Sequence, residues 1–255
     1  MKYGVSILSI VPMRSEPSDK SEMVNQILFG ESYKILKERK KFSRVRLSHD
    51  NYEGWICNKQ INYIDISEYN QLISSKKYIT TDILDIIKSE STQTIVMGSI
   101  LPKVENGIFN LNDNNFNFSG GFVQQTNIIK SKLVENSMML INTPYLWGGR
   151  TPFGIDCSGF TQIVYRLNGF SIPRDADQQS EIGNTLSFVD ESEPGDLAFF
   201  DNDDGDIIHV GIILENNYII HASGKVRIDR LDQQGIFNLD LGVHTHKLRL
   251  IKSII

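Results

Sequence analysis

The chain has 255 residues, of which 40% are hydrophobic and 22% charged, and its formal net charge is −5. These values are typical of a soluble globular protein that can bury a core in one large domain or several small ones. The chain shows no basic stripe of the nucleic-acid-binding kind and no run of the about 18 apolar residues that span a membrane. We therefore expect no nucleic-acid partner and no membrane partner, and we expect a monomer.

The N-terminus reads MKYGVSILSIVPMRSEPSD and lacks a small-residue cleavage site after its short apolar stretch. We interpret it as a first β-strand, and we expect a cytoplasmic protein unless an export signal has been removed, in which case the protein is secreted. Cys57 and Cys157 are the only cysteines, too few for a disulfide framework, which fits a reducing compartment.

Residues 1–66 contain short alternating strands separated by polar turns, including the loop SEPSDKSE and a tight turn near Asp50 and Asn51. This spacing predicts a small β-barrel. Residues 67–122 are more ambiguous, because YITTDILDIIKS fits either a helix or a pair of strands. The strand-like pattern and the Asn/Gly turns after it favour a second small β domain.

Residues 123–255 change character. The segment TNIIKSKLVENSMMLINT has apolar residues at helical spacing, namely Ile128, Ile129, Leu133, Val134, Met138 and Leu140. A second helix follows in SGFTQIVYRLNG and ends at Gly169, and a short helix lies in SIPRDADQQSEIG. Successive strands follow in PGDLAFF, DIIHVGIILE, NYIIHASG, KVRIDRL and HTHKLRLIK. Helices followed by a mostly antiparallel sheet indicate an α+β domain.

Cys157 lies at the start of the second helix, after the turn FGID. The free N–H groups and partial positive charge of a helix N-terminus stabilise a thiolate, so we expect a lowered thiol pKa and a reactive nucleophile. The same N–H groups can hold a developing oxyanion. An inert buried cysteine is the alternative.

His209 and His221 lie twelve residues apart in neighbouring predicted strands. Tight pairing of these strands would place both imidazoles on one face, where one could deprotonate Cys157 and the other orient the first ring. The alternative is a pair of core histidines. His244 and His246 have the spacing of a metal pair, but no third ligand is in view, and we expect no metal and no organic cofactor.

Five motifs in this part of the chain carry a resemblance. In chain order they are PYLWGGRTPFGIDCSGFTQIVY, IPRDADQQ, PGDLAFF, HVGIIL and IIHASG. They resemble the NlpC-type cysteine peptidases that cut bacterial cell-wall peptides, over most of residues 125–255. The resemblance implies a papain-like α+β domain with Cys157, His209 and His221 as its catalytic set.

The segments MRSEPSDKSEMVNQILFGE and NYEGWI resemble bacterial SH3-like domains that precede the peptidase in one subgroup. Members of that subgroup are γ-D-glutamyl-L-diamino acid endopeptidases, the dipeptidyl peptidase VI group. The resemblance implies two SH3-like modules, in residues 1–66 and 67–122, before a peptidase domain in residues 123–255. It also implies the substrate, a muropeptide with a free N-terminal L-Ala before γ-D-Glu and then L-Lys or meso-diaminopimelate, in cell-wall peptide recycling.

The resemblance further assigns residues to substrate recognition. Asp175 would hold the free amine, because a carboxylate makes charge-assisted hydrogen bonds to an ammonium, and Tyr52 and Glu16 would complete that pocket from the first module. A helix N-cap role for Asp175 and a solvated position for Glu16 are the alternatives. The chain departs from some relatives at Ala176, where a hydroxyl residue would add a substrate hydrogen bond.

The remaining assignments concern residues close to Cys157 in the sequence. Tyr145 would help hold the oxyanion, and Ser158 would bind the D-Glu carboxylate. Asp156 flanks the nucleophile and Trp147 would wall the cleft, both as substrate-binding residues. Packing is the alternative for the two aromatic residues. Arg174 is either a second carboxylate contact or a surface charge.

Three other functions stay open at this point. A secreted hydrolase would use the SH3-like modules to hold intact peptidoglycan, and a decayed peptidase domain would leave a non-catalytic wall-binding protein. An amidase or acyltransferase on a related fold is a more distant option.

Overall fold

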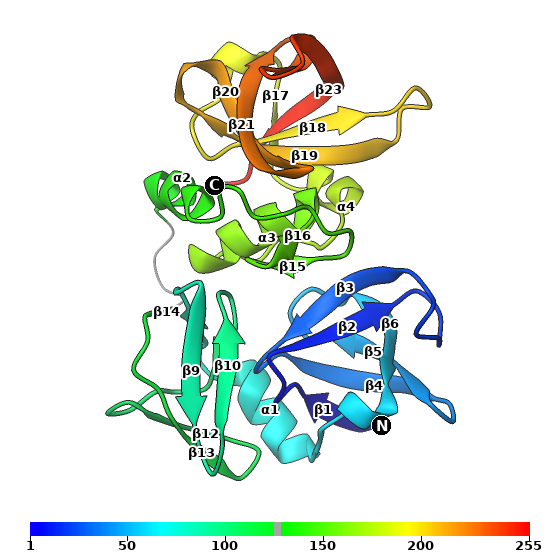
Figure 1. The fold of residues 1–255 in the computed structure, drawn as a ribbon, viewed down its shortest axis with the longest axis vertical. Coiled ribbons are helices and arrows are strands. Elements are labelled where there is room, and N and C mark those ends of the chain that lie inside the picture. The colour runs from blue at the N-terminus through cyan, green and yellow to red at the C-terminus, as the bar shows by residue number, and fades with distance from the viewer. Residues whose placement is uncertain (125–128) are drawn as a thin grey trace. The chain divides into compact units, whose positions relative to one another are not determined.

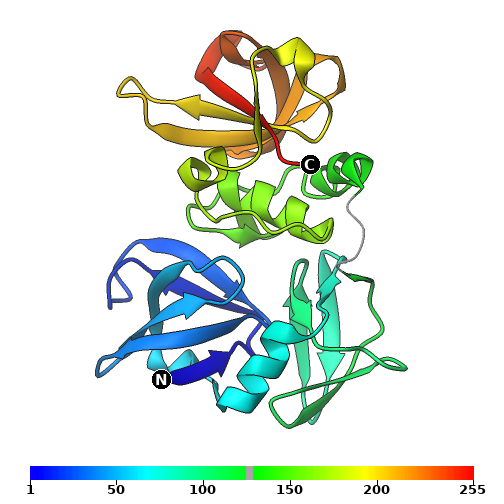
Figure 2. The same ribbon diagram turned by 180° about the vertical axis from the view of Figure 1, so that it is seen from behind.

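The computed structural model describes residues 1–124 and 129–255, so the expected helical residue Ile128 lies outside the described residues. The chain divides into two compact units (Figures 1 and 2). The first consists of Met1–Thr126 with Trp147–Thr151, and the second of Asn127–Leu146 with Pro152–Ile255. Within the described ranges no helix is long and apolar enough to cross a membrane.

The first module of the first unit is a small antiparallel barrel with strand order β3-β2-β6-β5-β4-β1-β7. Its elements are β1 (Lys2–Val5), β2 (Ile10–Arg14), β3 (Met23–Leu28), β4 (Ser32–Glu38), β5 (Phe42–Leu47), β6 (Glu53–Cys57), η1 (Asn58–Gln60) and β7 (Tyr63–Ile64). In β5, Val45 and Leu47 point into the core while Arg44 and Arg46 face outward to Glu53. The predicted turn is confirmed by Asn51, whose φ of 62° is tolerated by asparagine.

The second module follows the helix α1 (Ile66–Ser74) and consists of two small sheets. The sheets have the orders β10-β9-β13-β12 and β11-β8-β14, with β8 (Tyr78–Thr80), β9 (Leu84–Lys88), β10 (Thr92–Val96), β11 (Ile100–Leu101), β12 (Ile108–Leu111), β13 (Asn114–Asn117) and β14 (Phe122–Gln124). The ambiguous segment YITTDILDIIKS therefore contains two strands, but these belong to different sheets. Val5 and Phe29 of the barrel pack in the same core as Phe109 and Phe116, which joins the two modules into one unit.

Trp147–Thr151 pack within the first unit, although the sequence places them among residues of the second. Arg150 is fully buried and forms an ion pair with Glu31 at 3.0 Å, and it also donates to the backbone oxygen of Gln26 at 2.8 Å. Gly148 has a φ of +74°, and a Cβ there would lie 2.3 Å from the backbone oxygen of Met23. Only glycine fits that approach. This segment is therefore held by backbone contact as well as by a buried ion pair.

The second unit combines helices with a seven-stranded antiparallel sheet of order β17-β23-β18-β19-β20-β21-β22, and an additional β22–β23 pairing closes it. The strands are β17 (Asn184–Leu186), β18 (Leu197–Asp201), β19 (Ile207–Leu214), β20 (Tyr218–Ser223), β21 (Lys225–Asp232), β22 (Gly235–Asn238) and β23 (Val243–Ser253), with η2 (Val189–Glu191) and η3 (Glu215–Asn217) between them. The two-residue strand β16 (Gly154–Ile155) also belongs to this unit, whereas the two-residue strand β15 (Arg150–Thr151) belongs to the first. The helices α2 (Lys130–Met138), α3 (Cys157–Leu167) and α4 (Ala176–Ser180) lie together on one side of the sheet (Figures 1 and 2).

Helix α3 is the centre of the second unit, because all eleven of its residues are buried. It packs against α2 and against β19 and β20. Its end confirms the predicted glycine: Gly169 has a φ of 78°, its N–H reaches the Arg166 carbonyl, and the Phe170 N–H reaches the Tyr165 carbonyl. This is the Schellman arrangement, in which a left-handed residue satisfies the last carbonyls of a helix.

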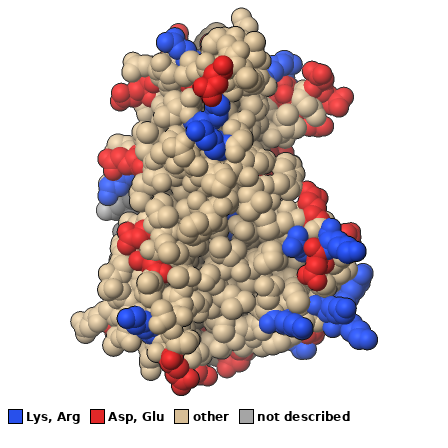
Figure 3. Space-filling view, viewed as in Figure 1, with Lys and Arg blue, Asp and Glu red and all other residues tan. Residues whose placement is uncertain are grey.

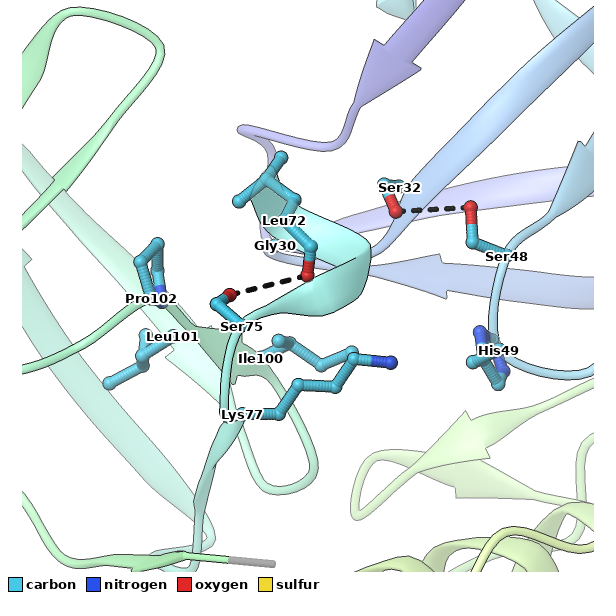
Figure 4. A pocket seen from close by; sticks show the side chains of 10 residues that line it. All are labelled: Gly30, Ser32, Ser48, His49, Leu72, Ser75, Lys77, Ile100, Leu101 and Pro102. Atoms are coloured by element: carbon cyan, nitrogen blue, oxygen red, sulfur yellow. Dashed lines mark hydrogen bonds between the residues drawn. The ribbon is translucent and has the colours of Figure 1, made fainter. Parts of the chain in front are cut away.

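The surface of the first unit carries charges of both signs, and one of its pockets is very small. Lys and Arg side chains gather at one edge of the barrel in Figure 3, but Asp and Glu side chains lie among them. The pocket in Figure 4 lies within this unit and is lined by Gly30, Ser32, Ser48, His49, Leu72, Ser75, Lys77, Ile100, Leu101 and Pro102. Its volume of about 10 Å³ is roughly the room that one water needs, so it is too small for a peptide.

We predict that Arg150→Met destabilises the first unit. The change leaves the fully buried Glu31 carboxylate without its guanidinium, and losing one partner of a buried ion pair costs about 3–5 kcal/mol of unfolding free energy. Denaturant unfolding followed by circular dichroism measures the loss. Arg46→Met is the control, because Arg46 pairs with Glu53 on the surface and its loss should cost less than about 1 kcal/mol. Equal effects of the two changes would contradict the prediction.

A second prediction concerns Asp85 on β9. Burial, and next the neighbouring Asp82 carboxylate, raise the pKa of Asp85 to about 6. The folded chain therefore binds a proton that the unfolded chain has released, so the free energy of unfolding should fall as pH rises from about 4 to about 6. Asp85→Asn should remove this dependence and stabilise the protein at pH 7, while changing little near pH 4.

Thermal unfolding at both pH values tests this expectation. Glu90→Gln removes one charge from an exposed position of the same module and serves as the control. An Asp85→Asn variant that is no more stable than wild type at pH 7 would show that the carboxylate is not protonated in the folded chain.

Candidate active site

Asp156 fixes the start of helix α3. It has the extended backbone of an N-cap residue, and its Oδ1 accepts a hydrogen bond of 2.7 Å from the Gly159 N–H. Side-chain capping of this kind satisfies one of the N–H groups that a helix leaves free at its first turn. Cys157 is therefore the first residue of the helix, which is the position expected from the sequence.

Arg174 holds the same carboxylate from the loop before α4. Its Nη2 lies 2.6 Å from Asp156 Oδ2 and its Nη1 lies 3.0 Å from Oδ1, and Nη1 also donates to the Ser158 hydroxyl at 2.8 Å. Arg174 is only 1% exposed, so its interpretation as a surface charge is wrong. Ser158 is also buried and its hydroxyl belongs to this polar network. The role of Ser158 in binding a substrate carboxylate stays a prediction.

Cys157 is a free and buried thiol. Burial, and next the Asp156 carboxylate, raise its pKa to about 12, although the N–H groups of Val210 and Ser158 donate to the sulfur and Arg174 is nearby. The expected lowering of the thiol pKa is therefore wrong for the free protein. The first turn of α3 does direct N–H groups at the sulfur, but removal from water outweighs them.

His209 and His221 meet as the strand spacing predicts. Their strands β19 and β20 pair antiparallel with Gly211 opposite His221, and His209 Nε2 lies 2.8 Å from His221 Nδ1. The Val210 N–H, which contacts the Cys157 sulfur, belongs to the residue after His209. Because Nε2 of His209 is occupied by His221, Nδ1 is the nitrogen left to receive the thiol proton.

Burial, and next the charges that His221 and His246 would carry, lower the pKa of His209 well below its ordinary value. The ring is therefore neutral at neutral pH and able to accept a proton. The resting site pairs a neutral thiol with a neutral imidazole, and the thiolate forms only when the proton moves to His209.

Two neighbours of these histidines escaped the sequence analysis. Oδ2 of Asp229 on β21 lies within hydrogen-bond distance of His221 Nε2, at 3.0 Å. The same oxygen accepts a hydrogen bond of 2.6 Å from Arg227 Nε. The signal was present in HASGKVRID, since a tight turn at Gly224 pairs His221 with Arg227 and alternation places Asp229 on the same face.

His246 on β23 is the third neighbour. Its ring stacks on His209 with centroids 4.3 Å apart, and burial, and next the charge that His221 would carry, lower its pKa to about 4. It is therefore a neutral cover for the catalytic imidazole at neutral pH. His244 instead pairs with Asp232 at 2.9 Å, and in the described part of the chain no group of three ligating side chains could hold a metal.

Two other predicted residues, Tyr145 and Asp175, belong to the second unit. Burial, and next the neighbouring Cys157 and Asp156, raise the pKa of Tyr145, so its hydroxyl keeps its proton and can donate a hydrogen bond. Asp175 occupies the N-cap position of α4, but its side chain does not cap that helix. N-capping is therefore not its role, and recognition of a substrate amine stays a prediction.

Three predicted residues belong to the first unit. Glu16 is exposed in the loop between β2 and β3, and Tyr52 precedes β6 and packs against the barrel core. Trp147 is 61% exposed and its indole N–H donates to the Glu22 carboxylate. Their roles in substrate binding stay predictions.

Two family models match this chain. Residues 142–243 match the NlpC/P60 family, and residues 13–61 match the bacterial dipeptidyl-peptidase Sh3 domain. Dipeptidyl-peptidase 6 of Lysinibacillus sphaericus is 28% identical over 264 residues, covering 91% of this chain and 92% of that protein. Gamma-D-glutamyl-L-lysine dipeptidyl-peptidase of Bacillus subtilis is 28% identical over 219 residues, covering 77% and 71%.

A solved structure extends the likeness to the whole fold. An NlpC/P60 family protein from Bacillus cereus superposes with a TM-score of 0.84 over 99% of both chains, at 19% sequence identity. The predicted fold class, a papain-like α+β domain after an SH3-like barrel, is thereby confirmed. Residues 142–243 therefore form a domain of the NlpC/P60 cysteine peptidase type, and residues 13–61 before it form a bacterial SH3 domain.

Proposed function

We propose that this protein is an endopeptidase that hydrolyses the γ-D-Glu–L-diamino acid bond of cell-wall peptides with a free N-terminal L-Ala. One observation carries the proposal: the sulfur of a helix-opening thiol accepts a hydrogen bond from Val210, the residue after His209, whose neutral imidazole is hydrogen-bonded to a second imidazole. The name of the relative from Bacillus subtilis, gamma-D-glutamyl-L-lysine dipeptidyl-peptidase, supports cleavage of peptides that contain γ-D-Glu-L-Lys.

In the first half of the reaction, His209 Nδ1 takes the proton of Cys157 as the sulfur attacks the γ-carbonyl carbon of D-Glu. The oxyanion accepts hydrogen bonds from the backbone N–H groups at the start of α3 and from the Tyr145 hydroxyl. As the C–N bond breaks, His209 returns the proton to the leaving amine of the diamino acid. The products are that amine and a thioester on Cys157.

In the second half, His209 takes a proton from water, which attacks the thioester carbon. The C–S bond breaks, the sulfur regains a proton from His209, and the dipeptide L-Ala-γ-D-Glu leaves. A neutral thiol at rest suits this sequence, because the reactive thiolate then forms only when the proton moves to His209. No redox partner is needed.

Recognition of the free amine is the part that directs the enzyme to recycled fragments instead of intact wall. Asp175 offers a carboxylate for the amine. Roles of Glu16 and Tyr52 in amine recognition rest on the resemblance of the first module to the SH3-like domains. A free L-Ala amine exists only where the peptide has been cut from its glycan. On this ground we propose a role in cell-wall peptide recycling, in the cytoplasm.

We predict that Cys157→Ala lowers cleavage of L-Ala-γ-D-Glu-L-Lys by at least about 10⁴-fold, because the nucleophile is lost. Mass analysis of the products should show L-Ala-γ-D-Glu and free L-Lys for wild type. Cys57→Ala is the matched control, since Cys57 is a free thiol on β6 of the other unit. Full activity of the Cys157 variant would refute the cysteine mechanism.

Blocking the N-terminal amine of L-Ala distinguishes a recycling enzyme from a hydrolase of intact wall. We predict that N-acetylation of the same tripeptide abolishes cleavage, because an amide carries no charge for the carboxylates to bind. Equal cleavage of free and acetylated peptides would identify a wall hydrolase. A product mass that shows acyl transfer would identify an acyltransferase on a related fold, and one that shows amide release would identify an amidase.

A further inference from the structure

We propose that Asp229, held in place by Arg227, is a positioning residue that sets which nitrogen of each catalytic histidine carries a proton. The inference rests on the proposed function, since it concerns the same thiol–imidazole site. The residues His209, His221 and Asp229 are called the histidine relay below.

The relay is built on three neighbouring strands and is closed to water. His209 lies on β19, His221 on β20 and Asp229 on β21, and both His221 and Asp229 have no exposed surface. His209 Nε2 is 2.8 Å from His221 Nδ1, and His221 Nε2 is 3.0 Å from Asp229 Oδ2. Both nitrogens of His221 are thus committed within the protein.

The carboxylate of Asp229, the relay member farthest from Cys157, can only accept hydrogen bonds. Arg227 donates to Asp229 from Nε at 2.6 Å and from Nη2 at 2.8 Å, and the Leu239 N–H donates to Oδ1 at 2.9 Å. Burial opposes the charge, but the hydrogen bonds from His221, Arg227 and Leu239 outweigh it and lower the pKa of Asp229. The carboxylate is therefore ionised and has no proton to donate.

The proton positions follow in order from that end. Because Asp229 only accepts, His221 must carry its proton on Nε2, and a neutral imidazole then has a bare Nδ1. His209 must donate to this Nδ1 from Nε2, which leaves its own Nδ1 bare. That is the nitrogen left to take the proton of Cys157, so the carboxylate prepares the base from two side chains away.

The positive charge of Arg227 cancels the negative charge of Asp229, so this ion pair has no net charge beside the His209 and His221 rings. Asp229 therefore acts by where it accepts hydrogen bonds, and it adds little net negative charge to the site. Arg227 Nη1 also pairs with the exposed Asp240 at 2.9 Å, which keeps the guanidinium in place from the solvent side. His246 covers the face of His209 but makes no hydrogen bond within the relay.

Asp229→Asn tests the proposal, because the amide reverses the relay. An amide oxygen in the place of Oδ1 keeps two hydrogen bonds, from Arg227 Nη2 and from the Leu239 N–H. The NH₂ group then takes the place of Oδ2, where it faces His221 Nε2 and leaves the Arg227 Nε–H without its acceptor. His221 would then carry its proton on Nδ1 and donate to His209, and His209 would be protonated on the nitrogen that faces the thiol. We expect kcat to fall by about 10²–10⁴-fold with little change in KM, the range that a general base contributes.

The deciding measurement is the ¹⁵N spectrum of the imidazoles, which reports the bare nitrogen of each ring without any substrate. We expect wild type to show a bare Nδ1 in both His209 and His221, and Asp229→Asn to show a bare Nε2 in both. The rate of Cys157 alkylation by iodoacetamide at pH 7 should fall in parallel with kcat. Both readouts stay valid if the tripeptide is not the substrate, so failure of the proposed function is recognised separately.

Asp232→Asn is the matched control. It makes the same change three residues along β21, where the carboxylate pairs with the exposed His244, and it should leave kcat within about twofold. Unchanged nitrogen positions in Asp229→Asn would overturn the proposal, whether or not kcat falls, since a loss of activity alone would indicate only structural damage. A protonated Nδ1 on His209 in wild type would overturn it even if the variant does not fold.

Discussion

The ion pair between Asp156 and Arg174 is the interaction on which the geometry of the site depends. One buried carboxylate caps helix α3, holds Arg174 from the loop before α4, and places Cys157 as the first helical residue. Gln179 of α4 adds hydrogen bonds to the Ser158 and Pro173 carbonyls, which tie the same loop to the helix. Because a buried charge without its partner is costly, these elements are ordered together or not at all.

Burial also decides the chemistry of the thiol. A helix N-terminus favours a thiolate, but a sulfur without contact to water loses the solvation that would stabilise its charge. The same burial keeps His209 and His246 neutral. The thiol and the imidazole are thus buried and uncharged. The charges around them belong to two ion pairs, Asp156–Arg174 and Asp229–Arg227. Charge separation is confined to the moment at which the proton moves.

The segment Trp147–Thr151 shows how a short stretch can belong to a unit that the sequence does not suggest. It lies between α2 and α3 of the peptidase, yet Arg150 is buried against Glu31 and Gly148 approaches the backbone at Met23. The motif PYLWGGR therefore serves two purposes. Tyr145 near its start is an electrostatic neighbour of Cys157 in the second unit, while Arg150 at its end contributes to the stability of the first unit.

The sequence by itself determined the parts that local patterns encode. The start of α3 follows from the turn FGID and the end of the helix from Gly169, and the meeting of His209 with His221 follows from two short neighbouring strands. Only the tertiary structure decided the raised thiol pKa, the stacked His246, the buried Arg174 and the place of Trp147–Thr151. Each of these depends on groups far away in the chain that exclude water or supply a charge, and no local periodicity records which distant groups will pack together.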